Sequence, residues 1–263
     1  LASKVTGRSG MDWFRGSETR LDRDNILQSV EDSLKRLKTD YIDLLQLHWP
    51  DRKSNFFGNL DYKHSKEDDF IPLELQLEAL AELAKSGKVR YIGLSNETPW
   101  GVAKFLELSK TNNLPRIVSV QNPYSLLNRS FEIGLSEIAI RENCGLLAYS
   151  PLAFGVLSGK YLGGKKPKGA RLTLFGDQFT RYTKERSIQA TEEYERIAKK
   201  HNLDFAQMSL AFINRQPFLT SNIIGATTME QLKSNIGSLG ISLSEDIISD
   251  IETVHSSNPN PSP

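Results

Sequence analysis

The sequence has little that would tie it to an oxidising compartment, a membrane or a nucleic acid. Its only cysteine, Cys144, cannot form a disulfide within the chain, and no apolar run approaches the ~20 residues of a membrane span. The 33 Lys and Arg residues nearly equal the 32 Asp and Glu residues, so the net charge of +1 gives no general attraction to anionic partners. We therefore expect a reduced, cytoplasmic protein that binds neither nucleic acid nor membrane.

Several familiar motifs are missing as well. There is no G-x-G-x-x-G after a first strand, no G-x-x-x-x-G-K-[ST] and no G-x-S-x-G, which argues against a Rossmann site, a P-loop and an α/β-hydrolase. His64, His201 and His255 have no ligand spacing, so we predict no metal site. The first residues lack an initiator Met and the features of a signal peptide, so we expect the sequence to begin inside a longer protein.

The residues that are present alternate between short apolar strands and helices with apolar residues at helical spacing. Strands that are apolar on both faces, each separated from the next by a helix, predict a parallel sheet covered by helices. We predict one domain over residues 1–263. Its strands are Ala2–Val5, Tyr41–Trp49, Val89–Asn96, Ile117–Gln121, Leu146–Tyr149 and Ile223–Gly225. Its helices are 26–37, 74–85, 99–110, 131–142, 188–200, 206–214, 229–237 and 244–254.

Turn residues support these boundaries. Thr98-Pro99 is typical of a helix start, Ser86-Gly87 of a helix end, and Thr228-Met-Glu-Gln231 of a capping box. Two long segments, 50–72 and 151–187, have no regular pattern, and both follow strand ends. Long loops at the carboxyl ends of parallel strands often serve the active site, so we expect that role here.

Polar residues accumulate where the predicted strands end: Lys4, His48, Ser95-Asn96, Gln121, Tyr149-Ser150 and Gly225-Ala-Thr-Thr228. If the strands lie side by side, these groups share one mouth of the sheet, where such folds bind ligands. A lone His48 is more often a hydrogen-bonded structural residue than a catalytic one. Lys4 on the neighbouring strand favours function, because a buried lysine is costly without a task or a partner.

Two further segments have a functional and a structural interpretation. The turn from Gly225 to the next helix offers free N–H groups to a phosphate, or it is plain helix capping. The segment Ser150–Tyr161 with Lys160, followed by Arg171, offers two cations to a pyrophosphate, or it is a solvated surface loop.

At this point the motifs resemble a known family, the aldo-keto reductases, in order and spacing over nearly the whole chain. The matching segments are Ala2-Ser-Lys-Val5, Asp43–Pro50, Gly87–Asn96, Gln121-Asn-Pro-Tyr124, Tyr149–Leu152 and Gly225–Leu232. Gln121–Glu132 and Asn55-Phe-Phe-Gly58 look most like the bacterial Tas-like branch. The resemblance implies a (β/α)8 TIM barrel with NADP(H) across its C-terminal mouth and a small carbonyl compound as substrate.

The resemblance also implies a role for each matching residue. Lys4 matches the lysine that lowers the pKa of a catalytic tyrosine, and His48 matches the histidine that orients the substrate carbonyl. Residues that match the nicotinamide contacts are Ser95, Asn96, Gln121 and Tyr149. Those that match the pyrophosphate loop are Ser150, Leu152, Gly155, Lys160 and Arg171. Those that match the contacts to the adenosine end are Gly225, Thr227, Gln231 and Asn235.

Two departures from the family pattern stand out. The family's catalytic aspartate and tyrosine precede the lysine strand, so the first two βα units are missing from this sequence, and we expect the 263 residues alone to be inactive. Thr228 stands where many relatives carry a basic residue near the 2′-phosphate, which makes NADPH less firmly favoured over NADH. Two other interpretations stay open: an NADPH-binding regulatory subunit that resembles potassium-channel β subunits, and a doubly wound nucleotide-binding domain.

Overall fold

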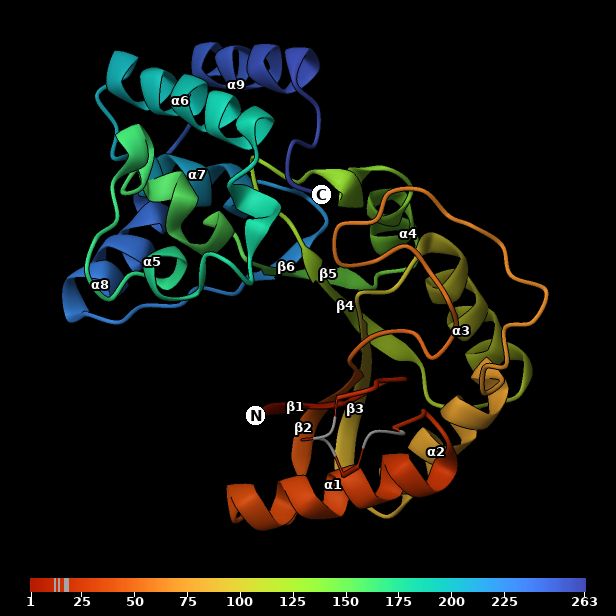
Figure 1. Ribbon diagram of the computed structural model, residues 1–263. Helices are drawn as coiled ribbons and strands as arrows, with labels where there is room; N and C mark the ends of the chain where they lie inside the picture. The colour runs from red at the N-terminus through yellow and green to blue at the C-terminus, as the bar shows by residue number, and fades with distance from the viewer. Residues whose placement is uncertain (12, 14, 17–18) are drawn as a thin grey trace. The chain divides into compact units, whose positions relative to one another are not determined.

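The computed structural model describes residues 1–11, 13, 15–16 and 19–263, in which strands and helices alternate (Figure 1). The strands are β1 (Ala2–Val5), β2 (Ile42–Leu47), β3 (Val89–Ser95), β4 (Ile117–Pro123), β5 (Gly145–Tyr149) and β6 (Leu219–Asn222). They follow one another in the sheet in chain order, and β1 to β4 pair in parallel. The predicted α/β class, with helices between parallel strands, is confirmed.

The described residues divide into two compact units. One consists of Leu1–Asn122 and Glu137–Leu146, the other of Pro123–Ser136 and Leu147–Pro263. The interpretation of the chain as a single domain stays a prediction.

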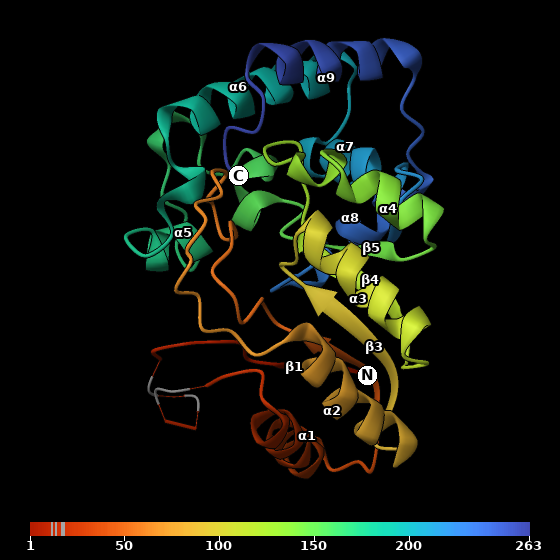
Figure 2. The same ribbon diagram turned by 90° about the vertical axis from the view of Figure 1, so that its right-hand side faces the viewer.

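In the first unit, three helices pack on the sheet of β1 to β4 (Figures 1 and 2). They are α1 (Arg23–Leu37), α2 (Leu73–Lys85) and α3 (Pro99–Thr111). Their apolar faces are fully buried at Ile26, Leu77 and Phe105, as their helical spacing requires. In the sheet, Lys4 pairs with Gln46 and Gln46 with Gly93, so these residues lie side by side.

The helix boundaries follow the predicted turn chemistry. The Thr98 hydroxyl accepts from the N–H of Gly101 at 3.3 Å, with Pro99 at the first helical position. Gly87 follows α2 with φ +78°, a conformation that glycine adopts without strain. The Thr228 hydroxyl accepts from the N–H of Gln231 at 3.2 Å. The first two predictions are confirmed, and the capping box is confirmed in part, because Gln231 Oε1 accepts from the N–H of Thr227 and not from that of Thr228.

The second unit is mostly helical. Helix α7 (Phe205–Asn214) forms its centre, with Met208, Leu210 and Phe212 fully buried. Helices α6 (Glu185–Lys200) and α9 (Glu245–Ser257) pack side by side (Figure 2). The remaining helices are α4 (Leu135–Arg141), which the two units share, α5 (Arg171–Phe175) and α8 (Met229–Gly237).

Three predictions of local structure need correction. The helix expected over 131–142 is split into a 3₁₀ turn, Ser130–Glu132, and α4, because Gly134 at φ +94° cannot continue a helix. The last strand is Leu219–Asn222 and not Ile223–Gly225. That strand was missed because its residues are mostly polar, whereas the apolar pair Ile223-Ile224 lies just beyond it.

The third correction concerns the segment 151–187, which was expected to be irregular. It contains short helical pieces at Ala153–Ser158, Leu162–Gly164, Arg171–Phe175 and Thr180–Tyr182. The segment 50–72, in contrast, has no helix or strand, as predicted. Periodicity cannot detect helical turns of three to six residues, which explains the difference.

Candidate active site

Lys4 and His48 lie at the same end of two paired strands in the first unit. The backbone N–H of His48 donates to Val5 O at 2.9 Å, which fixes the two chain segments side by side. Burial lowers the pKa of Lys4. Burial, and next the charge of Lys4, lower the pKa of His48 to about 4. His48 is therefore neutral at pH 7 and can donate one ring N–H to a ligand.

The ends of β3 and β4 are joined by hydrogen bonds. The Ser95 hydroxyl donates to Gln121 O at 2.8 Å, and the backbone N–H of Asn96 donates to the same oxygen at 3.0 Å. The side-chain amide of Asn96 donates to His48 O at 2.8 Å and to Ser95 Oγ at 3.2 Å. Four predicted site residues, His48, Ser95, Asn96 and Gln121, are thus brought together, and Asn96 adopts φ +51° to reach them.

A buried ion pair lies next to the hydrogen-bonded ends of β3 and β4. Glu97 and Arg52 have side chains that are only 4% and 10% exposed, and they form an ion pair with two hydrogen bonds. The second Arg52 nitrogen also donates to Thr98 Oγ1 at 2.9 Å, and its guanidinium lies 4.8 Å from the centre of the Trp100 ring. The pair ties the segment 50–72 to the turn that follows Ser95-Asn96.

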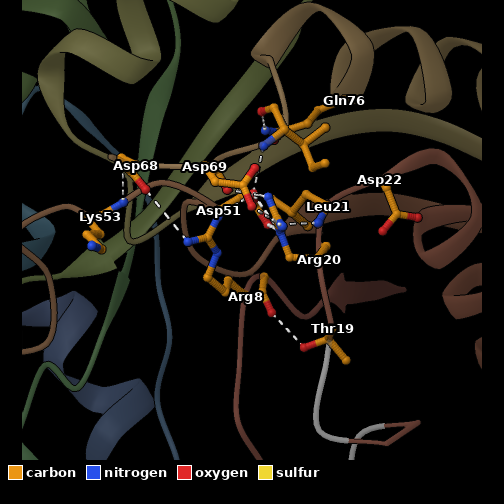
Figure 3. A network of polar contacts seen from close by, with 12 residues as sticks. Arg8, Thr19, Arg20, Leu21, Asp22, Asp51, Lys53, Asp68, Asp69 and Gln76 are labelled. Carbon is orange, nitrogen blue, oxygen red and sulfur yellow. Dashed lines mark hydrogen bonds and ion pairs between the residues drawn. The ribbon is translucent and has the colours of Figure 1, made fainter. Parts of the chain in front are cut away.

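Asp51 is a second anchor, three residues after His48, and its side chain is fully buried (Figure 3). It accepts from Arg20 Nε at 3.1 Å and Nη2 at 3.0 Å, and from the N–H groups of Leu21 at 3.1 Å and Ile71 at 2.8 Å. One carboxylate thus joins the segment after β1 to both ends of the segment 50–72. The contacts of Asp51 are called the Asp51 clasp below.

The residues after β1 also contact Trp49. The indole N–H of Trp49 donates to Arg8 O at 3.0 Å. A Cβ at Gly7 would lie 2.5 Å from Trp49 O, so only glycine allows this approach. Arg8 forms ion pairs with Asp51 at 3.8 Å and with Asp68 at 3.7 Å (Figure 3). The chain around His48 is therefore held from two sides.

In the second unit, Tyr149 and Ser150 end β5. Burial raises the pKa of the Tyr149 phenol, and Arg181 lies close enough to oppose that rise. Tyr149 is therefore a neutral ring at pH 7, suited to stacking and not to proton transfer. Ser150 follows with φ +54°, and its hydroxyl is close to the buried Tyr182 phenol.

The segment after Ser150 makes a tight left-handed turn. Ala153, Phe154 and Gly155 have φ values of +48°, +58° and +90°, and Gly155 donates its N–H to Leu152 O at 2.8 Å. A Cβ at Gly155 would lie 2.7 Å from Lys160 Nζ. The glycine thus lets an ammonium group lie directly against the backbone of the turn.

Arg171 lies over the same turn. Its guanidinium is 4.1 Å from the centre of the Phe154 ring and 5.5 Å from that of Phe179. Phe154 in turn makes edge contacts with Phe179 and with Tyr182. The aromatic rings hold the cation in place and leave its N–H donors available at the edges of the stack.

The turn before α8 forms its own small network. Gln231 Oε1 accepts from the N–H of Thr227 at 2.9 Å and from its hydroxyl at 3.1 Å, and Asn235 donates to Gly225 O at 3.4 Å. Ile223 N–H donates to Ala148 O at 2.8 Å, so this turn starts beside the end of β5. Gly225, Thr227 and Gln231 are exposed and face solvent.

The predicted site residues thus gather in two groups, one in each unit. Lys4, His48, Ser95, Asn96 and Gln121 lie in the first, and the remaining ten lie in the second. Sequence reasoning missed Asp51, Arg52 and Glu97, because an isolated charge in a loop shows no periodicity and only the fold reveals that it is buried. It also missed Phe154, Phe179 and Tyr182. A signal was present, however, in aromatic residues spaced between basic ones.

Comparisons with known proteins define the class. The sequence profile of the Aldo/keto reductase family matches residues 1–256, so the chain belongs to this family of oxidoreductases. It is 53% identical to Protein tas of Escherichia coli K12, over 100% of this chain and 76% of that protein. It is 41% identical to an aldo-keto reductase of Babesia bovis, over 90% of this chain and 87% of that protein.

A third relative carries a more specific name. The chain is 30% identical to L-glyceraldehyde 3-phosphate reductase of Escherichia coli K12, over 89% of this chain and 64% of that protein. Family membership confirms the resemblance that the motifs indicated. In the part of the chain that the structure describes, no helix is long and apolar enough to cross a membrane.

Proposed function

We propose that the full-length protein reduces an aldehyde or ketone to an alcohol with NADPH. The observation that carries this proposal is the partly buried Lys4 and His48 at the ends of β1 and β2, next to the hydrogen-bonded group of Ser95, Asn96 and Gln121. Lysine and histidine with lowered pKa values at strand ends are typical of catalytic sites. The reductase named among the relatives supports carbonyl reduction.

The residues present fit a nicotinamide dinucleotide. The close approach of Lys160 to Gly155, with Arg171 stacked on Phe154, provides two cations for a pyrophosphate. The amide of Gln121 bonds to none of the residues that the structure describes, which leaves it available for a carboxamide. When bound, NADPH supplies the hydride that the carbonyl carbon accepts. Thr228, which caps α8, offers no charge to a 2′-phosphate. The proposed preference for NADPH over NADH therefore rests on the family resemblance and not on this residue.

The protein's own residues position the carbonyl and a proton. Neutral His48 donates its ring N–H to the carbonyl oxygen and thereby fixes the direction in which the carbonyl carbon faces. The Lys4 ammonium lowers the pKa of the phenol that the family resemblance assigns as proton donor. The resemblance assigns that tyrosine to a position before Lys4. We therefore also propose that residues 1–263 alone, without the proton donor, are inactive. Location in the cytoplasm stays a prediction.

The test uses the full-length protein, NADPH and a panel of aldehydes that includes nitrobenzaldehyde. We expect oxidation of NADPH that requires the aldehyde and falls at least ~100-fold in His48→Ala and in Lys4→Met. NADPH fluorescence should report binding in both variants. Binding without turnover in the wild-type protein would instead favour the regulatory subunit, and absence of binding would reject both.

A further inference from the structure

The turn after β3 carries Ser95 and Asn96, two of the residues proposed to contact the nicotinamide. Asn96 has φ +51°, in the left-handed region that residues other than glycine seldom adopt. Such a backbone conformation persists where the contacts on both sides of it are fixed. On one side, the Ser95 hydroxyl and the Asn96 N–H both donate to Gln121 O, at 2.8 and 3.0 Å. The other side of the turn is Glu97.

The side chain of Asn122 fixes the backbone of Glu97 with two hydrogen bonds. Asn122 Oδ1 accepts from the Glu97 N–H at 3.1 Å, and Asn122 Nδ2 donates to Glu97 O at 3.0 Å. A backbone N–H only donates and a carbonyl only accepts, so these bonds define which way the amide points. A side-chain amide has the same donor and acceptor as a peptide group. Asn122 therefore pairs with Glu97 as a neighbouring strand would, beyond the register pair of Ser95 and Gln121.

Asn122 and Gln121 are neighbours on β4, so their side chains point to opposite faces of the sheet. Gln121 is the residue proposed to contact the carboxamide, whereas Asn122 reaches the turn. Asn122 and Glu97 are both buried. Because water has little access to either residue, it does not compete for the two hydrogen bonds. One amide is thus available to a ligand, and the next one along the strand fixes the backbone.

The side chain of Glu97 is fixed as well. Its carboxylate forms the buried ion pair with Arg52. A Cβ at Gly101 would overlap Glu97 Oε1, so the first turn of α3 packs directly on the carboxylate. Contacts to both the backbone and the side chain of Glu97 therefore determine where Asn96 lies. The Asn96 amide in turn donates to His48 O at 2.8 Å, so the turn also contacts the residue proposed to orient the carbonyl.

We propose that Asn122 is a positioning residue for recognition of the nicotinamide carboxamide. By pairing with both backbone groups of Glu97, it holds Asn96 in the left-handed conformation that presents the Asn96 side chain to the cofactor. The inference rests on the nicotinamide cofactor of the proposed function, because a carboxamide must be present to be recognised. It does not require that the hydride passes to a carbonyl compound.

The first test measures recognition of the carboxamide by the full-length protein, with isothermal titration calorimetry. The probes are NADP⁺, its 3-acetylpyridine analogue, which has a methyl ketone in place of the amide, and 2′-phospho-ADP-ribose, which lacks the ring. We expect the wild-type protein to bind NADP⁺ about 5-fold or more tighter than the analogue, as for one lost hydrogen bond. Asn122→Ala should reduce this preference below about 2-fold and leave binding of 2′-phospho-ADP-ribose unchanged. A role in folding alone would weaken all three probes alike.

Asn122→Asp is a second variant, which keeps the volume of the side chain in case the alanine variant does not fold. It retains the acceptor for the Glu97 N–H but loses the donor to Glu97 O, so it should also lose the preference for NADP⁺. Exchange of the Glu97 N–H with deuterium, followed by NMR, tests the other bond directly. This exchange should be faster than in the wild-type protein in Asn122→Ala and nearly unchanged in Asn122→Asp. Unchanged exchange in Asn122→Ala would overturn the inference.

Asn128→Ala is the matched control. Asn128 is also a buried asparagine that pairs with nearby backbone, since its Oδ1 accepts from the Ser130 N–H at 3.1 Å and from the Ser130 hydroxyl at 2.6 Å. This variant should keep the wild-type preference for NADP⁺ over the analogue. An equal loss of preference in Asn128→Ala and Asn122→Ala would reject the inference, and so would a wild-type protein that binds both dinucleotides equally.

The results also separate this inference from the proposed function. If the Asn122 variants lose the preference but the wild-type protein reduces no carbonyl compound, the proposed reduction fails and the inference stands. If the wild-type protein reduces aldehydes and the variants keep the preference, the inference fails alone. A wild-type protein that binds none of the three probes rejects both.

Discussion

At the scale of the residue, the candidate site contains two bases that are partly removed from water. Burial lowers the pKa of both Lys4 and His48, and the charge of Lys4 lowers that of His48 further. Burying these two groups disfavours their charged forms. At the end of the sheet the resulting neutral imidazole of His48 can serve as a hydrogen-bond donor. A structural histidine is instead paired with an acceptor, as His201 at the end of α6 is with Asp250 at 2.8 Å.

The lowered pKa of His48 predicts a pH dependence of stability. The His48 imidazole binds a proton near pH 6.5 in the unfolded chain, but only near pH 4 in the folded chain. Between these values the unfolded state binds more protons, so stability falls as the pH is lowered, by on the order of 1–3 kcal/mol. His48→Gln should remove this part of the loss. Urea unfolding of the full-length protein at pH 7.5 and pH 5 measures it, and an identical loss in both proteins would contradict the assignment.

Sequence alone could predict that Lys4 and His48 lie near strand ends, because a polar residue that ends an apolar strand interrupts a visible pattern. It could not predict that Glu97 and Arg52 form a buried pair, since 45 residues separate them in the chain. Asn122 was also overlooked. It stands near the end of a strand, and only the fold shows that its amide pairs with the backbone of Glu97.

At the scale of the element, the segment 50–72 has no helix or strand, and buried charges hold it in place. In the Asp51 clasp, the carboxylate accepts hydrogen bonds from two nitrogens of Arg20 and from the backbone N–H groups of Leu21 and Ile71. A buried carboxylate paired in this way stabilises the loop chiefly because its removal leaves the buried N–H of Leu21 without an acceptor and leaves Arg20 with the exposed Asp69 as its remaining ion-pair partner.

Two aspartates that both pair with Arg20 provide a matched comparison. The Asp51 side chain is fully buried, whereas that of Asp69 is 89% exposed and lies 3.4 Å from Arg20. We expect Asp51→Asn to lower the free energy of unfolding by about 2 kcal/mol or more. Asp69→Asn should change it by less than about 0.5 kcal/mol. Urea unfolding of the full-length variants gives both values, and equal losses would show that the clasp does not depend on Asp51.

The elements themselves were predicted well where the pattern is long. Helices such as α1 and α6 carry an apolar face over four turns, which no strand could reproduce. The errors fell on short or polar pieces. Strand β6, with Thr220 and Ser221 exposed, is formed by pairing with its neighbour and not by its own composition.

At the scale of the whole molecule, positive and negative charges nearly cancel. With a net charge of +1, the protein has no general field that would attract an anionic cofactor. Any dependence of cofactor binding on salt would therefore come from a few local cations, and Lys160 and Arg171 both lie at the turn after β5.

We expect Lys160→Met and Arg171→Met each to raise the Kd for NADPH about 10-fold at low salt, because a charge-assisted contact to phosphate is lost. Each should also make the Kd less sensitive to salt between about 50 and 500 mM. Lys166→Met, which removes an exposed lysine from the same segment, changes the net charge equally and is the control. Fluorescence titration of the full-length proteins decides the matter: an equal effect of all three substitutions would point to the overall charge.

The Asp51 clasp sets a rule for exchanging loops between relatives. A chimera that receives only residues 50–72 from another aldo-keto reductase would carry that protein's residue at position 51, while Arg20, which pairs with Asp51, would stay unchanged. Arg20 and the N–H of Leu21 lie in a different part of the chain. Grafts that aim to transfer substrate preference should therefore carry residues 7–21 together with 50–72. The two segments should be exchanged together, although 28 residues separate them in the sequence.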